Sequence, residues 1–320
     1  MSLKLGVVGT NFVSDWLCEA VAQTDGITAS AVFSRKEETG YAFAKKHDIP
    51  NVFTDWDGFL LSGIDAVYLA SPTFCHFEQA KAALEKGLHV LCEKPLVMKR
   101  DQSEVLFALA KEKGVILMEA MRPAHDPAFA LVKDSLADLG TIRRVSFEYC
   151  QYSSRYDRYQ NGEVLNAFEP KVSGGALFDI GIYPLFWCVA LFGKPKSVSA
   201  KSVFLKNGFE GSGCLLLDYD GFTASVTYSK ICDSVIPSVI TGERGSLLIH
   251  KMQSPEKIVF APRGGDALPL DYLPAENNLV YEVRDFVAAI KSGCGGVFDA
   301  FTRDLYETLD LAVMAAEIQW

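Results

Sequence analysis

The stretch LKLGVVGTNFVS, residues 3–14, decides how this chain begins to fold. Residues 3–8 form a short run rich in valine and leucine, which is typical of a β-strand buried on both faces. Gly9 follows at once, and the pattern over residues 15–23 is helical. A strand, a glycine turn and a helix at the head of a βαβ unit predict a site for the pyrophosphate of a dinucleotide.

The turn departs from the G-x-G-x-x-G dinucleotide fingerprint, because Gly9 is its one glycine. Asn11 stands at the second glycine position and Ser14 at the third. Asparagine tolerates a positive φ better than most residues, and serine is small enough for a helix to pack closely on a strand. We expect Gly9, Thr10, Asn11 and Phe12 to contact the dinucleotide, with an ordinary βα turn as the alternative.

The remaining pattern up to residue 120 alternates strands with helices, which predicts a doubly wound parallel sheet of the Rossmann type. The expected strands cover residues 28–33, 66–69, 89–92 and 115–118, and the expected helices cover residues 36–47, 74–86 and 101–113.

After residue 120 strands follow one another, and Asp220-Gly221 between two of them is a strong hairpin signal. We expect an α+β domain with a largely antiparallel open sheet. Its strands are placed at residues 142–149, 197–205, 214–219, 222–228, 246–250 and 257–260, and its helices at residues 176–191, 277–291 and 302–319. The predicted domains are residues 1–120, for the dinucleotide, and 121–320, for substrate and dimerisation. An alternative for the C-terminal helix is that it packs back on the first domain. We expect the ligand to bind between the two domains.

The composition excludes several classes of function. The net charge is −9, and lysine and arginine form no basic stripe, so nucleic acid is not an expected partner. No apolar run suggests a membrane span, and no signal peptide precedes the first strand. The eight cysteines include no C-x-x-C pair and no metal-ligand spacing. We expect a cytoplasmic protein with reduced thiols and no metal site.

The end of the second strand favours NADP(H) over NAD(H). NAD-binding units place a carboxylate there to hold the ribose hydroxyls, but this chain has FSRK at residues 33–36. Ser34 can donate a hydrogen bond to a 2′-phosphate, and Arg35 can pair with it or stack on adenine. NAD(H) is the alternative cofactor. The alternative interpretation of Arg35 and Lys36 is that they form the solvated start of a helix and bind no phosphate.

HVLCEKPLV, residues 89–97, places charge at the end of an apolar strand. Lys94 is expected at the carboxyl end of a parallel strand, where such sheets bind ligands. Asp179 and Tyr183 are four residues apart, which puts them on one face if residues 176–191 are helical. Oxidation of an alcohol needs a hydride acceptor and a base for the hydroxyl proton.

Five segments together resemble the glucose–fructose oxidoreductase/inositol dehydrogenase/rhizopine-catabolism (Gfo/Idh/MocA) family. They are GVVGTN at residues 6–11, ASPTFCH at 70–76, HVLCEKPL at 89–96, LMEA at 117–120 and GGALFDIGIYPL at 174–185. The subgroup that the chain resembles is the dimeric dihydrodiol dehydrogenase and NADP-dependent xylose dehydrogenase type.

The resemblance implies catalytic roles for three residues. Lys94 matches the catalytic lysine of the family, Asp179 matches its aspartate partner, and Tyr183 stands where many members have histidine. Our hypothesis is that Tyr183 carries the proton while Lys94 activates it and orients the substrate hydroxyl. The reverse assignment, with Lys94 as the base, stays open.

The resemblance also implies further cofactor contacts and a dimer. Ser71, Pro72 and His76 would border the nicotinamide and its ribose, and Glu93 would position Lys94 or contact that ribose. The second domain's sheet would form a homodimer contact.

The expected function is therefore NADP(H)-dependent hydride transfer to or from a secondary alcohol or carbonyl of a sugar, polyol or cyclic diol. Two alternatives are a non-catalytic dinucleotide-sensing regulator on the same fold and an NAD-assisted glycosidase.

Overall fold

A computed structural model of the chain describes residues 2–319. The chain forms two compact units, the first made of Met1–His125 with Ala275–Ala300 and the second of Asp126–Pro274 with Phe301–Trp320. The segment Ala275–Ala300, which we expected in the second domain, thus lies in the first. The reason is its apolar face, because Val283, Phe286 and Val287 share one buried core with Leu17 and Val21.

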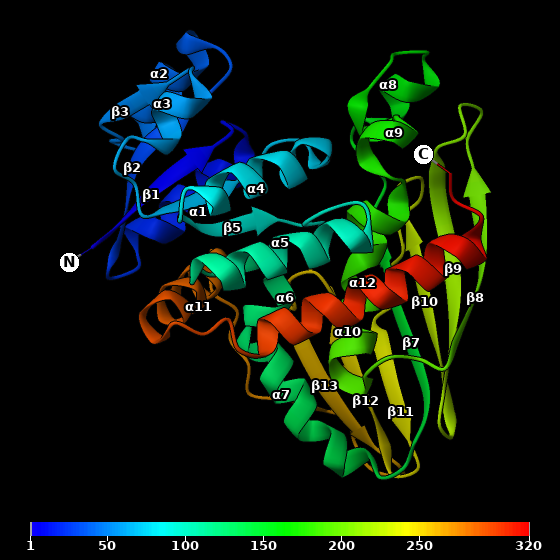
Figure 1. Ribbon diagram of the computed structural model, residues 1–320. Coiled ribbons are helices and arrows are strands. Elements are labelled where there is room, and N and C mark those ends of the chain that lie inside the picture. Colours follow the sequence, from blue (N-terminus) through cyan, green and yellow to red (C-terminus); the bar gives the residue numbers. More distant parts are fainter. Residues whose placement is uncertain (1, 320) are drawn as a thin grey trace. The chain divides into compact units, whose positions relative to one another are not determined.

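The first unit contains a six-stranded parallel sheet in the order β3-β2-β1-β4-β5-β6, so the predicted Rossmann fold is confirmed (Figure 1). The strands are β1 (Leu3–Val8), β2 (Ile27–Phe33), β3 (Asn51–Phe53), β4 (Ala66–Leu69), β5 (His89–Glu93) and β6 (Leu117–Ala120). All four residues of β4 and of β6 are buried, as expected for strands covered on both faces.

Helices cover this sheet, with α1 packed against α11 and α4 packed against α5. They are α1 (Phe12–Ala22), α2 (Glu37–Lys46), α3 (Trp56–Leu60), the 3₁₀ turn η1 (Thr73–Cys75), α4 (His76–Glu85), α5 (Arg100–Lys113), α6 (Arg122–His125) and α11 (Leu279–Ser292).

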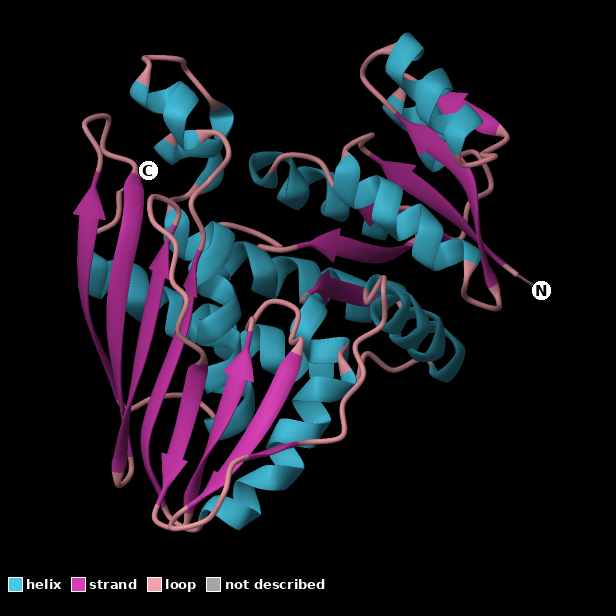
Figure 2. Ribbon diagram, turned by 180° about the vertical axis from the view of Figure 1, so that it is seen from behind, coloured by secondary structure: helices cyan, strands magenta, loops and turns pink. Residues whose placement is uncertain are grey.

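The second unit contains an eight-stranded sheet in the order β14-β13-β12-β11-β7-β10-β9-β8, which Figure 2 shows with its strands in front and α10 behind. The predicted antiparallel character is confirmed, with β7 and β10 as a parallel pair. The predicted hairpin is also present, because Tyr219 pairs with Phe222 across Asp220-Gly221. The strands are β7 (Ile142–Cys150), β8 (Ser197–Phe204), β9 (Glu210–Tyr219), β10 (Phe222–Ser229), β11 (Ser238–Gly242), β12 (Gly245–His250), β13 (Lys257–Pro262) and β14 (Leu268–Pro269).

The helices of the second unit include one departure from prediction. The continuous α-helix expected over residues 176–191 is wrong at its start, where η4 (Leu177–Gly181) is a π-helical turn that leads into α10 (Ile182–Phe192). The other helices are α7 (Pro127–Ser135), η2 (Leu136–Leu139), α8 (Tyr156–Gln160), η3 (Asn166–Phe168), α9 (Pro170–Ser173) and α12 (Val297–Ala316), which begins in the first unit.

Within residues 2–319, one helical stretch, Pro170–Phe192, is long and apolar enough to cross a membrane, contrary to our expectation that no run suggests a span. However, 78% of its most apolar window is buried inside the chain. The core helix of a folded unit has the same composition, so this stretch is weak support for a membrane span.

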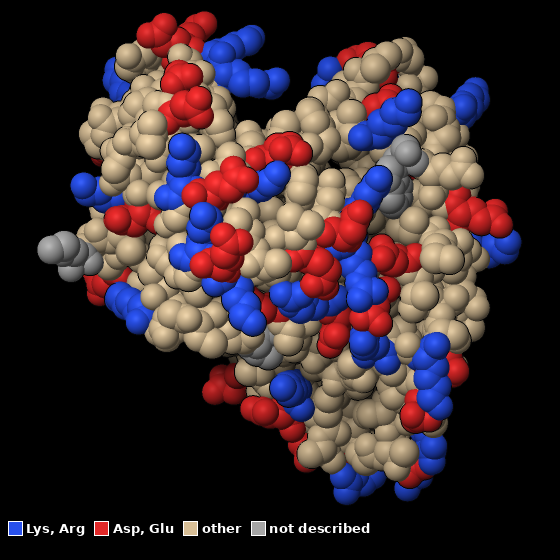
Figure 3. All heavy atoms as spheres, in the orientation of Figure 1, with Lys and Arg blue, Asp and Glu red and all other residues tan. Residues whose placement is uncertain are grey.

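Charged side chains of both signs are interspersed on the face shown in Figure 3. Among the described residues on that face, no stripe of one sign follows a helix or a sheet edge. A nucleic-acid footprint would be a continuous basic patch, and this face presents none.

Candidate active site

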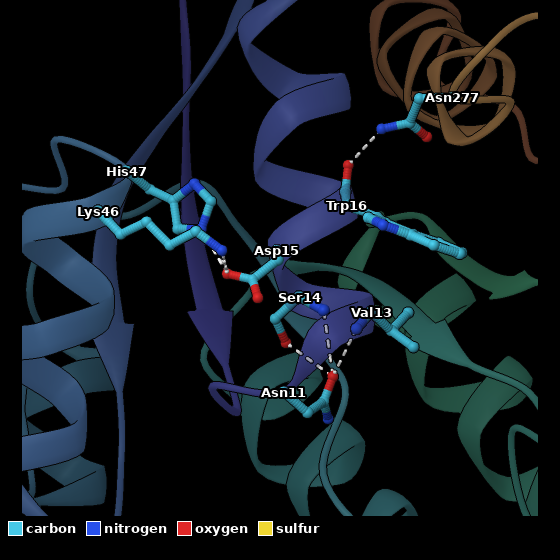
Figure 4. Close-up of polar contacts among 8 residues, drawn as sticks. All are labelled: Asn11, Val13, Ser14, Asp15, Trp16, Lys46, His47 and Asn277. Carbon is cyan, nitrogen blue, oxygen red and sulfur yellow. Dashed lines mark hydrogen bonds and ion pairs between the residues drawn. The ribbon is translucent and has the colours of Figure 1, made fainter. Parts of the chain in front are cut away.

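The turn between β1 and α1 is built around Asn11, the N-cap of α1 (Figure 4). Its Oδ1 accepts hydrogen bonds from the backbone N–H groups of Val13, at 3.0 Å, and Ser14, at 3.1 Å. Its Nδ2 donates to the carbonyl of Ala70 at 2.8 Å. The backbone of Asn11 is extended, with φ −95°, so this turn makes no use of the tolerance of asparagine for a positive φ. Asn11 serves as a helix cap.

Gly9 is the position at which this turn requires glycine. Its φ is +99°, and a Cβ built on it would lie 2.9 Å from the carbonyl oxygen of Ala70. Since β1 lies between β2 and β4, the turn opens where the strand order reverses, which is where open α/β sheets bind ligands. The N-terminus of the 11-residue α1 begins there and favours an anion.

Replacing Asn11 with alanine is expected to lower the free energy of unfolding by about 1 kcal/mol, the usual contribution of an N-cap. NADPH binding should weaken as well, because the turn loses its tie to Ala70. Asn11→Ser is the matched control, since serine keeps a capping oxygen but lacks the amide donor. Urea unfolding and NADPH fluorescence titration measure the two effects. Equal stability of Asn11→Ala and the native chain would contradict the capping role.

The loop after β2 contains Ser34 and Arg35. The Ser34 hydroxyl is buried, 2.7 Å from Thr39 Oγ1 and 2.9 Å from the Lys36 carbonyl oxygen. Thr39 Oγ1 lies 3.0 Å from the same carbonyl, so in either arrangement the Ser34 proton is used within the loop. A bond from Ser34 to a 2′-phosphate must replace one of these contacts. Arg35 is exposed.

The loop after β4 contains Ser71, Pro72 and η1, and it leaves the sheet on the other side of β1 from the loop after β2. Burial raises the pKa of the Cys75 thiol in η1, and the positive charge of Arg35 opposes this rise. Pro72 precedes η1, and the Ser71 hydroxyl donates to Gln79 Oε1 at 2.5 Å. Arg35, Ser71 and Pro72 therefore lie at one edge of the sheet, at the carboxyl ends of β2 and β4, the two strands that flank β1.

His76 joins two turns of the predicted site. Its imidazole is 1% exposed, with Nδ1 2.9 Å from the Pro95 carbonyl oxygen and Nε2 2.8 Å from the Ser71 carbonyl oxygen. Burial lowers the pKa of His76, against the two carbonyl contacts. A neutral ring donates one of these two bonds. The structure thus gives His76 the role of a bridge, and its predicted contact with the cofactor stays a prediction.

Lys94 directly follows β5, in a turn that buried polar groups hold. Glu93 accepts a hydrogen bond of 2.6 Å from the hydroxyl of Tyr68, whose pKa is raised by burial. Glu119 accepts a hydrogen bond of 2.9 Å from the backbone N–H of Leu96. We did not predict Tyr68 or Glu119, although a glutamate inside the apolar strand LMEA was a signal for the latter. These contacts fix the backbone on both sides of Lys94.

Glu282 of α11 is a buried acid behind this turn. Its side chain is 0% exposed, and neither carboxyl oxygen has a hydrogen-bond partner among the described residues. Burial, together with the negative charges of Glu93, Asp285 and Glu119, raises the pKa of Glu282 well above its ordinary value, and Arg122 opposes this. The surroundings of Glu282 therefore favour its neutral carboxylic acid form over the carboxylate.

Glu282→Gln is expected to stabilise the chain at alkaline pH. A carboxyl with a raised pKa in the folded state favours folding at low pH, and this advantage is lost as the pH rises from 4.5, its ordinary value, through the folded-state pKa. The variant should therefore be more stable than the native chain at about pH 8 by a larger margin than at about pH 5. Each tenfold difference in proton affinity between the folded and unfolded states corresponds to about 1.4 kcal/mol of that margin. Urea unfolding at the two pH values measures it, and parallel pH dependences of variant and native chain would contradict it.

Asp179 and Tyr183 lie on η4 and α10 of the second unit. The buried carboxylate of Glu210, on β9, binds the start of η4. Its Oε2 accepts a hydrogen bond of 2.9 Å from the backbone N–H of Leu177. Gly181 passes so close to β10 that a Cβ on it would lie 2.7 Å from the Tyr228 ring. A π-turn in this position re-aims the side chains before it relative to those after it, and such turns are frequent at functional sites.

The carboxylate of Asp179 pairs with Lys230, which we did not predict. Lys230 Nζ lies 2.7 Å from Asp179 Oδ2. Nothing in the sequence marks this lysine, because it joins Asp179 only through the fold of the sheet. Tyr183 is 5% exposed, and its ring makes an edge contact with Tyr149 at 5.8 Å between centroids.

Residues 151–168, which follow β7, carry several tyrosine rings that contact one another; we call them the aromatic segment. Tyr156 stacks on Tyr159 at 6.0 Å between centroids, and both contact Phe168, which is 1% exposed. Arg158 pairs with Glu163 at the surface. The segment thus presents tyrosine rings over a buried phenylalanine.

Within each unit, the predicted site residues lie close to one another. The Gly9 turn, the loops at Arg35 and Ser71, and the turn at Lys94 follow β1, β2, β4 and β5 of the first unit. Asp179 and Tyr183 share one helical segment of the second. Within residues 2–319, no group of three or more His, Cys, Asp or Glu side chains is arranged to hold a metal ion.

Comparison with known proteins agrees with the fold of both units. Residues 3–121 match the oxidoreductase family with an NAD-binding Rossmann fold, GFO_IDH_MocA, and residues 130–248 match the GFO/IDH/MocA C-terminal domain. The scyllo-inositol 2-dehydrogenase (NADP(+)) IolU of Bacillus subtilis is 40% identical, over 90% of this chain and 88% of the relative. The trans-1,2-dihydrobenzene-1,2-diol dehydrogenase of Xenopus tropicalis is 28% identical, over 81% of this chain and 79% of the relative.

Among solved structures, KijD10, a 3-ketoreductase from Actinomadura kijaniata in complex with NADP and TDP-benzene, has the same fold. The TM-score is 0.89 and the identity 24%, over 99% of this chain and 98% of that one. The family matches and the IolU similarity together show that this chain belongs to the Gfo/Idh/MocA family of oxidoreductases.

Proposed function

We propose that this chain transfers a hydride between NADP(H) and a secondary alcohol or carbonyl of a sugar, polyol or cyclic diol, with Lys94, Asp179 and Tyr183 as its catalytic residues. The observation that carries the proposal is the position of Lys94. It follows β5, at the same sheet edge as the Gly9 turn after β1, so it lies at the edge where the sheet binds its ligand.

The residues at this edge fit a dinucleotide. Gly9 leaves room for a close approach of backbone and ligand, and the capped N-terminus of α1 suits the pyrophosphate. Thr10 and the exposed Phe12 flank Asn11. Arg35 is exposed at the end of β2, where no carboxylate stands to repel a 2′-phosphate. NADP(H) is therefore favoured.

The chain's own residues handle the proton. When bound, the nicotinamide supplies the hydride acceptor or donor. Tyr183 donates or accepts the hydroxyl proton, and Lys94 orients the substrate hydroxyl and stabilises the phenolate form of Tyr183. Asp179 contributes a fixed negative charge. Ser71, Pro72, His76 and Glu93 shape the nicotinamide end of the site.

Turnover of a panel of aldoses, polyols and trans-diols, followed by the ultraviolet absorbance of NADPH, tests the proposal. We expect reduction of NADP⁺ with at least one member and a lower kcat/KM with NAD⁺. Arg35→Ala should reduce the ratio of kcat/KM with NADP⁺ to kcat/KM with NAD⁺, because it removes the proposed contact with the 2′-phosphate. No turnover on the whole panel would favour the regulator, and tightly retained NAD(H) in the purified protein would favour the glycosidase.

Two further features belong to this proposal. The face of the eight-stranded sheet that carries Leu216, which is 51% exposed, is the proposed homodimer contact, and sedimentation equilibrium tests it. The cytoplasm is the proposed compartment, because all eight cysteines are free thiols and such compartments keep thiols reduced.

A further inference from the structure

Lys230, directly after β10, presents a buried ammonium group to Asp179. Its Nζ lies 2.7 Å from Asp179 Oδ2 and donates to the Ala167 carbonyl at 2.8 Å. The lysine side chain is 5% exposed, whereas that of Asp179 is 41% exposed. The carboxylate is therefore anchored from its buried side and accessible from the other.

Two aromatic rings complete the surroundings of this ammonium group. Lys230 Nζ lies 5.0 Å from the ring centroid of Phe168 and 5.2 Å from that of Phe209. A desolvated cation is attracted to an aromatic face, and a buried charge is tolerated when it is paired and hydrogen-bonded. The carboxylate, the carbonyl and the rings together meet that requirement, so this lysine is built into its position.

The backbone of Lys230 is held as firmly as its side chain. Its N–H donates to the Gly211 carbonyl at 2.9 Å, and its carbonyl accepts from the Ser153 N–H at 2.9 Å. Ser153 lies near the start of the aromatic segment, residues 151–168, and Ala167 lies near its end. Lys230 thus contacts both ends of that segment and the carboxylate of Asp179.

We propose that Lys230 is a positioning residue that fixes the orientation and negative charge of Asp179 and couples it to both ends of the aromatic segment. This inference rests on the proposed function, in which Asp179 is one of the three catalytic residues and contributes a fixed negative charge. Lys230 acts through Asp179 and not on the substrate itself.

Lys230→Met removes the ammonium group and keeps most of the apolar stem. We expect kcat to fall by about 10- to 100-fold, a share of the 10²–10⁴-fold that acid–base catalysis contributes. KM should rise only a few-fold, and NADPH affinity should not change. Lys196→Met is the matched control, because it removes an exposed lysine–aspartate pair, with Asp220, from the same sheet. Its kcat should equal that of the native chain.

A double-mutant cycle separates positioning from simple structural support. If Lys230 acts through Asp179, then Asp179→Asn with Lys230→Met should be no slower than Asp179→Asn alone. Lys230→Arg should recover part of kcat, because it restores the positive charge. Lys230→Gln, which keeps a donor for Ala167, serves if the methionine variant does not fold.

The outcomes are distinct. Additive losses in the cycle, or an unchanged kcat in a folded Lys230→Met or Lys230→Gln variant, would overturn the positioning role while the native turnover still supports the proposed function. A native chain that turns over no member of the panel would overturn the proposed function and the positioning role of Lys230 with it.

Discussion

Lys94→Ala is expected to lower kcat by about 10²–10⁴-fold, the range that a positioned acid–base group contributes. The lysine stands in a turn whose backbone is fixed independently of its side chain, through Glu93 on one side and Leu96 on the other. The substitution should therefore remove the ammonium group without moving the turn. NADPH affinity and melting temperature should stay close to those of the native chain.

Stopped-flow and steady-state turnover measure the loss, and NADPH fluorescence titration measures binding. Lys99→Ala is the control, because Lys99 is exposed in the same loop and its side chain does not cap α5. Near-native turnover in a folded Lys94→Ala variant would remove Lys94 from the mechanism, and a loss of NADPH binding would reassign it to the cofactor.

Tyr183→Phe is expected to lower kcat by a similar factor, about 10²–10⁴-fold, if Tyr183 carries the proton. Phenylalanine retains the ring that contacts Tyr149, so folding should be preserved. Tyr219→Phe is the control, since it removes another buried hydroxyl of the same unit, one that donates to the Gly193 carbonyl at 3.0 Å. Turnover and its pH profile are the measurements.

The two variants together assign the proton carrier. If Tyr183 carries the proton, Tyr183→Phe should lower kcat by about 10²–10⁴-fold and should flatten the pH profile. If Lys94 is the base, Tyr183→Phe should keep a pH-dependent turnover within about tenfold of native, the effect of one ordinary hydrogen bond.

Periodicity predicted the long elements well because each has an apolar pattern of its own. The strands on either side of Asp220-Gly221 are examples, and so are the strands of the Rossmann sheet other than β3. β3 was not predicted, because three residues are too few to show an alternation. The helix over residues 176–191 was predicted as continuous. Its π-turn ends at Gly181, which closely approaches the Tyr228 ring, and this contact joins segments far apart in the chain.

Some residues of the candidate site were likewise predictable from the sequence, and others were not. Lys94 was predictable because Glu93 and Lys94 place two charges at the end of an apolar strand, where packing alone would favour apolar side chains. Asn11 was predictable as a special residue but not as a cap that also binds Ala70. Tyr68 and Glu282 carried no local signal, because what makes them special is burial beside Glu93.

The sequence by itself determined the two kinds of sheet, the dinucleotide turn and the identity of the proposed catalytic groups, since those depend on local pattern and on side-chain chemistry. Only the tertiary structure decided which partners those groups have. Lys230 meets Asp179 across a wide separation in sequence, and Glu119 reaches the turn of Lys94 from the neighbouring strand. The physical reason is that strand order and burial set both the neighbours of a charge and its solvation, and neither quantity is present in a local stretch of residues.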